Sequence, residues 1–422
     1  MKNAIPFTPY QKLVIVLLTL TQFSVVLDFM IMSPLGDMLM KSLDINTQQF
    51  GLVVSAYAFS AGTSGLLTAG FADRFDRKKL FVFFYGGFII GTLCCAISTT
   101  YPMLVAARIV TGLFGGVIGS ISMAIVTDLF PIEQRGRVMG FTQMGFGASQ
   151  VLGIPIGLYL ANFWGWEAPF FLVVGIAVVL MFLIWTGMQP ITAHLAFQRK
   201  KNALEHLWHT IKKGHYRAGF AATALFSIGG FMMMPFGSAF AINNLHVTQQ
   251  QLPLLFMVSG IASLVVMPLV GKLSDKTDRL QLAIIFTFFM MIMVAVYTHL
   301  TPYPLPVIIM LNVLMMICLI GRMIPSMALI TGVPEMQDRG AFMSVNSSLQ
   351  QIAGGIAAAV AGMIVVQETK TSPLKHYDTV GWVIIGVSMI CILLLARVSS
   401  IVKEKAKNAA PVMPKVDVIP EM

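Results

Sequence analysis

Long apolar stretches, separated by short polar or charged connections, run through the whole chain. We count twelve such segments, at about 11–33, 48–71, 79–99, 102–127, 136–161, 168–188, 217–241, 251–272, 280–299, 304–330, 340–366 and 379–401. Each is close to the roughly 20 residues that a helix needs to cross a bilayer core. Only a helix satisfies its own backbone groups there. The pattern therefore predicts an all-α membrane protein with twelve transmembrane helices.

Composition and charge placement support this reading. The chain is 57% hydrophobic and 11% charged, with a net charge of +10. Most basic residues fall at the N-terminus, in alternate connections or in the C-terminal tail; the exceptions are Lys41, Lys370, Lys375, Arg108 and Arg322. This is the positive-inside bias, and it predicts that both termini are cytoplasmic. The basic charge thus reports orientation in a lipid bilayer, and we expect no nucleic-acid partner.

One charged stretch, residues 69–79, occurs again as residues 271–279 at an offset of 202 residues. The corresponding residues are Asp73 with Asp275, Asp76 with Asp278, and Arg77 with Arg279. An offset of about half the chain indicates an internal duplication, which is common among secondary transporters. We therefore expect two six-helix bundles, residues 1–188 and 217–402.

Two further segments complete this division. Residues 189–216 are predicted to be a cytoplasmic linker, in which Leu204, Leu207, Trp208 and Ile211 share one face of a basic amphipathic helix on the inner leaflet. Residues 403–422 are polar and contain two prolines, so they are predicted to be a disordered cytoplasmic tail.

The stretch at 69–79 resembles the loop 2–3 signature of the major facilitator superfamily, roughly G-x-L-A-D-R-x-G-R-K. Residues 71–74 match, as do Arg77 and Lys78, whereas Ala69 and Asp76 replace the two glycines. The resemblance implies two pseudo-symmetric bundles around a central cavity lined by helices 1, 4, 7 and 10. It also implies a monomer that binds a small-molecule substrate, and it makes the protein a transporter and not an enzyme.

Asp28 and Arg108 are charged residues within apolar segments. Helical rise places Asp28 about 24 Å along the first segment and Arg108 about 9 Å below the start of the fourth. Such groups are costly in hydrocarbon, so we predict that they meet at one level, directly or through water. Alternatively, the first helix ends early and Asp28 is wetted. Asp37, beyond Pro34, is expected at the outer surface.

The fourth segment reads Arg108-Ile-Val-Thr-Gly112, which resembles the superfamily's helix-four motif, R-x-x-x-G. In the family this arginine faces the cavity and is implicated in proton coupling. We therefore assign proton coupling to Asp28 and Arg108, with protons as a second partner. Residues 145–157 resemble the family's helix-five antiporter motif imperfectly, since Pro155 follows Ile154 in place of glycine. A proline kink with glycine packing explains these residues equally well.

The resemblance also implies a cytoplasmic charge cluster that holds the two halves together in the outward-facing state. The residues assigned to this conformational latch are Asp73, Arg74, Arg77, Asp128, Arg135, Asp275, Arg279 and Arg339. The alternative is scattered surface charge, which contributes little.

The residues assigned to the substrate cavity are Gln22, Asp28, Met32, Tyr57, Arg108, Gln143, Gln150, Met234, Asn312 and Gln350. Arg322 is expected near the inner face, about 27 Å along its helix, where snorkelling explains it as well as any function. No cofactor or metal is expected, because no histidine lies deep in a span.

These features favour the twelve-helix drug:proton antiporter branch, which includes sugar and drug efflux permeases. The predicted function is proton-coupled efflux of a small apolar or amphiphilic solute by alternating access, in a bacterial inner membrane. The alternative is a proton symporter or facilitated importer of a sugar or another nutrient, because it would share the fold.

Overall fold

The computed structural model describes residues 6–68, 72–192, 195, 209–335 and 338–409. Within these ranges, twelve helices are long and apolar enough to cross a membrane, which confirms the number predicted from the apolar segments. Outside these spans the described chain includes the short helix at Gly36–Ser42, a 3-10 turn and irregular connections, with one isolated bridge between Val366 and Lys375.

The helices follow one another in two successive sets. The N half contains α1 (Pro9–Ile31), α2 (Gly36–Ser42), α3 (Thr47–Thr68), η1 (Ala72–Arg74), α4 (Arg77–Ala96), α5 (Tyr101–Leu129), α6 (Ile132–Ala148), η2 (Ser149–Gly153), α7 (Ile154–Trp164) and α8 (Ala168–Gly187). The C half contains α10 (Gly214–Phe231), η4 (Met234–Phe236), α11 (Gly237–Asn243), α12 (Leu252–Lys276), α13 (Arg279–Thr298), α14 (Leu305–Ile330), α15 (Arg339–Ile364) and α16 (Tyr377–Ala409).

The duplication seen in the sequence recurs in local structure. The first membrane helix of each half breaks at the same relative place, α1 after Ile31 and α10 after Phe231, and a short helix follows. Asp76 caps α4 and Asp278 caps α13. Each carboxylate accepts backbone N–H groups from the first turn of the helix that begins at the next residue. Equal caps at an offset of 202 residues set the same starting point for α4 and α13.

The last helix is longer than predicted. The bundle was expected to end at 402 and a disordered tail to begin at 403, but α16 continues to Ala409. Lys403 pairs with Asp278 at 2.8 Å, and Lys405 donates to the Pro334 carbonyl. These contacts stabilise the extra turns, and residues 410–422 lie outside the described chain.

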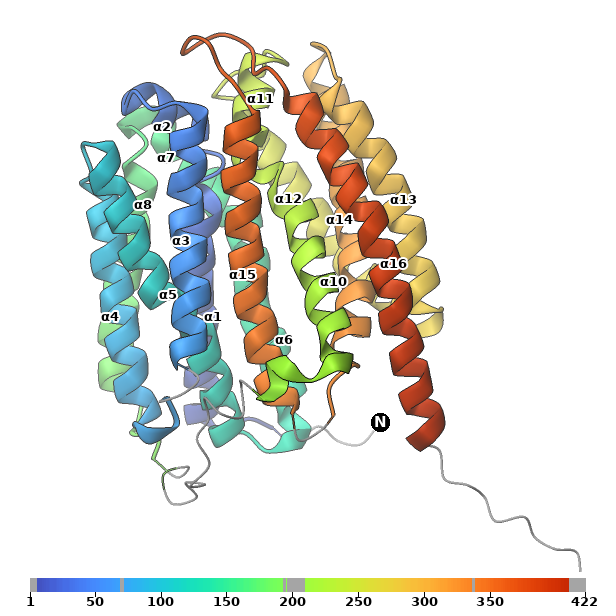
Figure 1. The fold of residues 1–422 in the computed structure, drawn as a ribbon. Coiled ribbons are helices and arrows are strands. Elements are labelled where there is room, and N and C mark those ends of the chain that lie inside the picture. The colour runs from blue at the N-terminus through green and yellow to red at the C-terminus, as the bar shows by residue number, and fades with distance from the viewer. Residues whose placement is uncertain (1–5, 69–71, 193–194, 196–208, 336–337, 410–422) are drawn as a thin grey trace, which may run out of the picture.

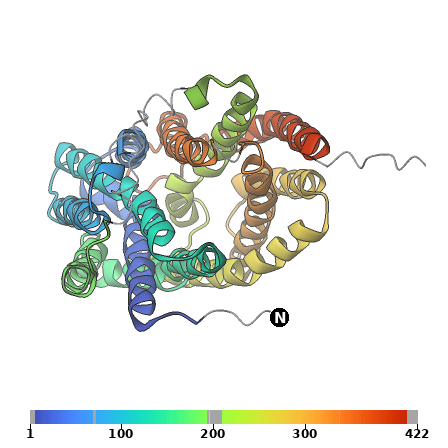
Figure 2. The same ribbon diagram turned by 90° about the horizontal axis from the view of Figure 1, so that it is seen from below.

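The two halves lie side by side, with α1 beginning and α16 ending at the same end of the bundle (Figure 1). We call this end the terminal end and the opposite one the distal end. Figure 2 shows the helices of both halves grouped around the middle of the molecule. Large apolar side chains are exposed on the outside of the bundle, including Phe83, Trp164 and Leu393, as expected for a surface solvated by lipid.

The main contact between the halves is a seam of small residues along α3 and α15. A side chain at Gly51 would collide with the backbone of α15, and one at Gly362 would meet the Thr47 carbonyl at 2.9 Å. Ser55 on α3 donates to the Gly355 carbonyl of α15 at 2.8 Å. Small residues let the two backbones approach closely, as is common between membrane helices.

A second contact closes the distal end. Ser33 bonds the Met234 carbonyl, and Ser238 donates to the Ser33 carbonyl at 2.7 Å. Asn243 of α11 donates to Asp37 of α2 at 2.7 Å. These bonds tie the break after α1 to the break after α10, so the halves are joined at the distal end in this conformation.

Candidate functional site

Asp28 and Arg108 form an ion pair inside the N half, as the sequence predicted. Asp28 lies on α1 just before its break, and Arg108 lies in the second turn of α5. Arg108 Nη1 is 2.9 Å from Asp28 Oδ2, and both residues are 0% exposed. The contact is direct, and the alternative of a wetted Asp28 at a helix end is wrong.

Two further helices complete the surroundings of this pair. Thr92 of α4 donates to Asp28 Oδ1 at 3.1 Å, so both carboxylate oxygens are occupied. The Arg108 guanidinium lies 4.5 Å from the centre of the Tyr57 ring, which belongs to α3. A cation over an aromatic face is stabilised by the ring quadrupole, and more strongly where water is excluded. The pair is therefore held by α1, α3, α4 and α5 together.

Glycines on α5 and α4 allow this approach. A Cβ at Gly112 would collide with the Tyr57 backbone, and one at Gly91 would meet Thr111 at 2.6 Å. On α5, which is the fourth membrane span, the R-x-x-x-G spacing thus places Arg108 one turn from Gly112, the glycine that lets α3 come close. This explains why the arginine and its glycine occur together in the sequence.

The site retains spare hydrogen-bonding capacity. Among the described residues, Arg108 Nε and the Thr21 hydroxyl are buried without a hydrogen-bond partner. Nearby, Ser24 and Tyr85 bond each other at 2.9 Å. The ion pair is neutral overall, so a proton added to Asp28 would leave Arg108 as an uncompensated charge in a dry interior. Such a change is costly enough to alter packing or to draw in an anion or water.

The other cavity residues are distributed over both halves. Met32 is buried beside the break after α1, and Met234 is half-buried at the corresponding break in the C half. Asn312 accepts from Ser259 at 2.8 Å and forms a second polar cluster between α14 and α12. Four predicted residues make no side-chain hydrogen bond within the described chain: Gln22, Gln143, Gln150 and Gln350.

The fifth membrane span, formed by α6, η2 and α7, is distorted where the antiporter-like motif lies. Residues Ser149–Gly153 form a π-turn, in which the Ile154 N–H bonds the Ser149 carbonyl. Pro155 has no N–H to continue the regular pattern, so the extra residue in the turn accommodates it. The turn packs against α12, where a Cβ at Gly260 would meet the Gln150 carbonyl at 3.0 Å.

The predicted latch is only partly assembled. Arg77 Nε bonds Asp128 Oδ2 at 3.0 Å, and both belong to the N half. Arg135 bonds the carbonyls of Thr127 and Phe130 at the end of α5, whereas Arg74 and Arg339 are exposed. Asp275 and Arg279 lie 3.9 Å apart on the C-half surface. The side chain of Asp73 lies outside the described residues.

Asp37 lies at the distal end as predicted, but the expectation that it is a surface residue is wrong. It is 1% exposed and accepts bonds from Lys41, Asn243 and Gln249. Its burial depends on α11 of the other half, which no pattern within its own segment could reveal.

Of the two interpretations that the sequence left open for Arg322, snorkelling at the inner face is wrong. Arg322 is 2% exposed, and its guanidinium bonds Phe226, Met290 and Ser388 on three neighbouring helices. Helical rise predicts how far along α14 Arg322 lies, but the direction of its side chain is set by the rotation of α14 against those helices. The signal that could have found it was the absence of any acidic residue inside the C-half spans.

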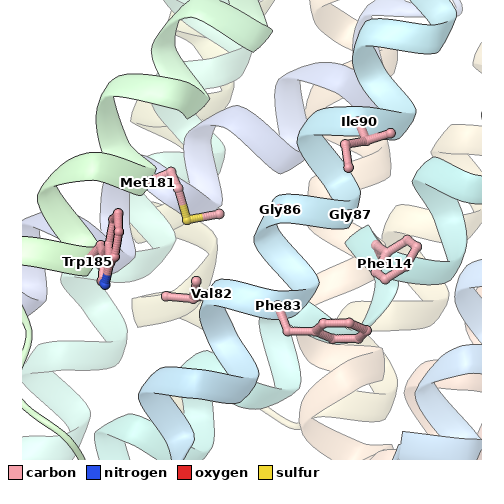
Figure 3. A pocket seen from close by; sticks show the side chains of 8 residues that line it. All are labelled: Val82, Phe83, Gly86, Gly87, Ile90, Phe114, Met181 and Trp185. Carbon is pink, nitrogen blue, oxygen red and sulfur yellow. The ribbon is translucent and has the colours of Figure 1, made fainter.

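An apolar groove on the N half and the linker between the halves lie apart from the buried ion pair. A groove of about 510 Å³ lies on the outside of the N half between α4 and α8 (Figure 3). Its walls are apolar, and Phe83 and Trp185 are 63% and 68% exposed, so it faces where lipid would lie. Of the predicted amphipathic linker helix, Ile211 packs against the C-half core, and the other three apolar residues lie outside the described chain.

The chain resembles known transporters throughout its length. The family profile described as Major Facilitator Superfamily matches residues 18–322 and again 219–418. An uncharacterized MFS-type transporter, YceJ of Bacillus subtilis, is 26% identical over 66% of this chain and 70% of its own length. A probable sugar efflux transporter of Helicobacter pylori is 21% identical over 57% of this chain and 60% of its own length. The multidrug resistance protein fnx1 of Schizosaccharomyces pombe is 32% identical, but over only 31% of this chain and 25% of its own length.

Solved structures show the same fold. A D-xylose-proton symporter superposes with a TM-score of 0.74 at 17% identity, covering 92% of this chain and 97% of the other. A bacterial homolog of the human lysosomal transporter Spinster superposes with a TM-score of 0.72 at 15% identity, covering 96% and 99%. With twelve helices in two repeated halves and a profile match to most of its residues, the chain is a multi-pass membrane transporter that belongs to the Major Facilitator Superfamily.

Proposed function

We propose that this transporter exports a small apolar or amphiphilic solute in exchange for protons, with Asp28 and Arg108 as the coupling pair. The observation that carries the proposal is the fully buried ion pair at 2.9 Å on α1 and α5. An ionisable pair within a membrane span is a functional-site hypothesis by default, because a structural core has no need for its desolvation cost.

The coupling follows from charge balance. A proton that reaches Asp28 from outside neutralises the carboxylate and weakens its bond to Arg108. The freed arginine charge favours rearrangement of α1 against α5, which opens the cavity to the other side. Release of the proton to the cytoplasm restores the pair, so proton entry and solute exit alternate at one site.

The direction and location of transport rest on charge placement. The terminal end is assigned to the cytoplasm of a bacterial inner membrane, because basic residues concentrate in its connections. The distal closure through Ser33, Ser238 and Asp37 then shuts the outer side. The latch between the halves at the cytoplasmic side belongs to the opposite, outward-facing state, which fits a pairing of Arg77 with Asp128 inside one half here.

The test is transport in proteoliposomes with ethidium and 2-naphthylacetate as amphiphilic solutes of opposite charge and D-glucose as the sugar. An acidic vesicle lumen with solute outside drives uptake by an antiporter, whereas a symporter requires acid on the side of the solute. We expect Asp28→Asn to keep solute counterflow but to lose gradient-driven accumulation.

The matched control is Asp278→Asn, the same substitution at an exposed helix cap of the other half. It should accumulate solute as the unmodified protein does. An Asp28→Asn variant that still pumps against a gradient would remove the coupling role, and uptake driven by acid on the solute side would favour the import alternative.

A further inference from the structure

Arg322 is a buried cation for which the described chain supplies no carboxylate. Its Nη1 lies 3.1 Å from both Met290 Sδ and Ser388 Oγ, and its Nη2 lies 3.1 Å from the Phe226 carbonyl. All three partners are neutral. The guanidinium also stacks 4.6 Å from the centre of the Phe226 ring. An arginine that is 2% exposed with only neutral partners is a strongly unfavourable arrangement unless a counter-charge is present during function.

No acidic side chain of the C half can serve as that counter-charge. The acidic residues of the described C half all lie in connections or near helix ends: Asp275, Asp278, Glu335, Asp338, Glu368, Asp378 and Glu404. Glu335 and Asp338 contact Lys213, and Glu368 contacts Lys375. Asp278 is paired with Lys403, and Asp275 with Arg279. In the N half the same problem is solved by Asp28, whereas α10 carries glycine at the corresponding place, residue 230.

We propose that Arg322 is the binding site for the carboxylate of an organic anion with an apolar body. The neighbouring Phe226 ring and Met290 thioether offer contacts to an apolar or aromatic body, and the guanidinium fork fits a carboxylate. Gly229 lets the guanidinium lie against the backbone of α10, since a Cβ there would meet Arg322 Nη2 at 3.2 Å.

The place of Arg322 along its helix suits loading from the cytoplasm. It lies eight residues before the terminal end of α14, about 12 Å inside the bundle by helical rise. The Asp28–Arg108 pair lies instead near the distal end. The proposal rests on the proposed function in this respect, because the anion is then the exported solute, recognised apart from the proton site.

The experiment measures binding by the full chain in lipid nanodiscs without any pH gradient. The probes are 2-naphthylacetate, its neutral amide 2-naphthylacetamide, and sodium chloride alone. We expect the unmodified protein to bind the carboxylate at least about tenfold more tightly than the amide, since a charge-assisted bidentate pair forms only with the former. Arg322→Gln should reduce this preference to about one.

Ser388→Asp is the sharper variant, because it keeps Arg322 and gives it an internal carboxylate at the position of the Ser388 hydroxyl. It should raise the melting temperature and abolish the preference for the carboxylate probe. Ser388→Asn, of the same size but neutral, should keep the preference and should not raise the melting temperature.

The proposal is overturned if the unmodified protein binds the two naphthyl probes equally, or if Ser388→Asp keeps the preference. A preference lost equally in Ser388→Asn would also overturn it, as would an effect of sodium chloride equal to that of the carboxylate. Because no gradient is applied, the preference is measured without proton coupling, so the failure of proton coupling and the failure of this site give different results.

Discussion

The two halves share one arrangement of helices but treat a buried arginine in opposite ways. Arg108 of the N half meets a carboxylate at 2.9 Å and is neutralised. Arg322 of the C half meets a thioether, a hydroxyl and a carbonyl. A neutral pair can take up and release a proton, whereas an unbalanced cation creates a positive potential. This contrast agrees with our proposals that the N half carries proton coupling and the C half solute recognition.

The largest effect is expected from breaking the N-half pair. Asp28→Asn leaves Arg108 buried without a counter-charge, which should lower the free energy of unfolding by about 3–5 kcal/mol. Thermal and denaturant unfolding of the detergent-purified protein would measure this loss.

The double variant Asp28→Asn with Arg108→Gln sharpens the comparison. It removes both charges, so it should be more stable than Asp28→Asn alone. If the single and double variants lose the same stability, the two side chains are not coupled and the N half is no more balanced than the C half.

The next effect concerns the hydrogen bond that orients the carboxylate. Thr92→Val removes a bond to a charged acceptor and should cost about 1.5–3 kcal/mol of unfolding free energy. Thr287→Val on α13 is the matched control, because the Thr287 hydroxyl bonds only a carbonyl of its own helix. An equal loss in both variants would contradict a special role for Thr92.

The helix caps test whether the halves also differ at the terminal end. Asp76→Ala should cost about 1 kcal/mol as a lost cap. The cost should exceed that of Asp278→Ala, because half-buried Asp76 also accepts the Ile191 N–H, whereas the additional partner of exposed Asp278 is the exposed Lys403. Unfolding midpoints of the two variants measure the difference. A larger loss for Asp278→Ala would reverse this ranking of the two halves.

The smallest effect is a pH dependence at α13. The Lys403 ammonium bonded to Asp278 lowers the pKa of that carboxyl, and the Gln281 and Leu280 N–H groups add to this. A lowered pKa gives stability that is present above the unfolded pKa and lost as pH falls through the folded one. Lys403→Ala should therefore weaken the acid dependence of the melting temperature below about pH 4. The change stays under about 1 kcal/mol because both side chains are well exposed.

Much of the fold could be read from the sequence because hydrocarbon imposes one solution on long apolar segments. The pairing of Asp28 with Arg108 was also accessible, since helical rise alone puts them at one level. What sequence could not provide was the direction of a side chain around its helix. Arg322 was placed at a reasonable height and assigned to the wrong environment for this reason.

Contacts between the halves were the second gap. Asp37 is buried by α11, more than 200 residues away along the chain. The π-turn between α6 and α7 arises from packing and Pro155 together. The latch residues were predicted to meet in an outward-facing conformation, which differs from the present one. Such features follow from tertiary arrangement, which a one-dimensional pattern of apolar residues does not specify.

The seam of small residues between α3 and α15 has a mechanical consequence. At Gly51, Ser55 and Gly362 the two helices meet with little more than backbone between them, so at this part of the seam no long side chain has to move when one half tilts. The two helices can therefore tilt against each other while the hydrogen bonds that close the distal end break and re-form. A single bulky substitution at Gly362 would hinder the tilting of α3 against α15. We expect such a protein to bind its solute but to exchange it slowly.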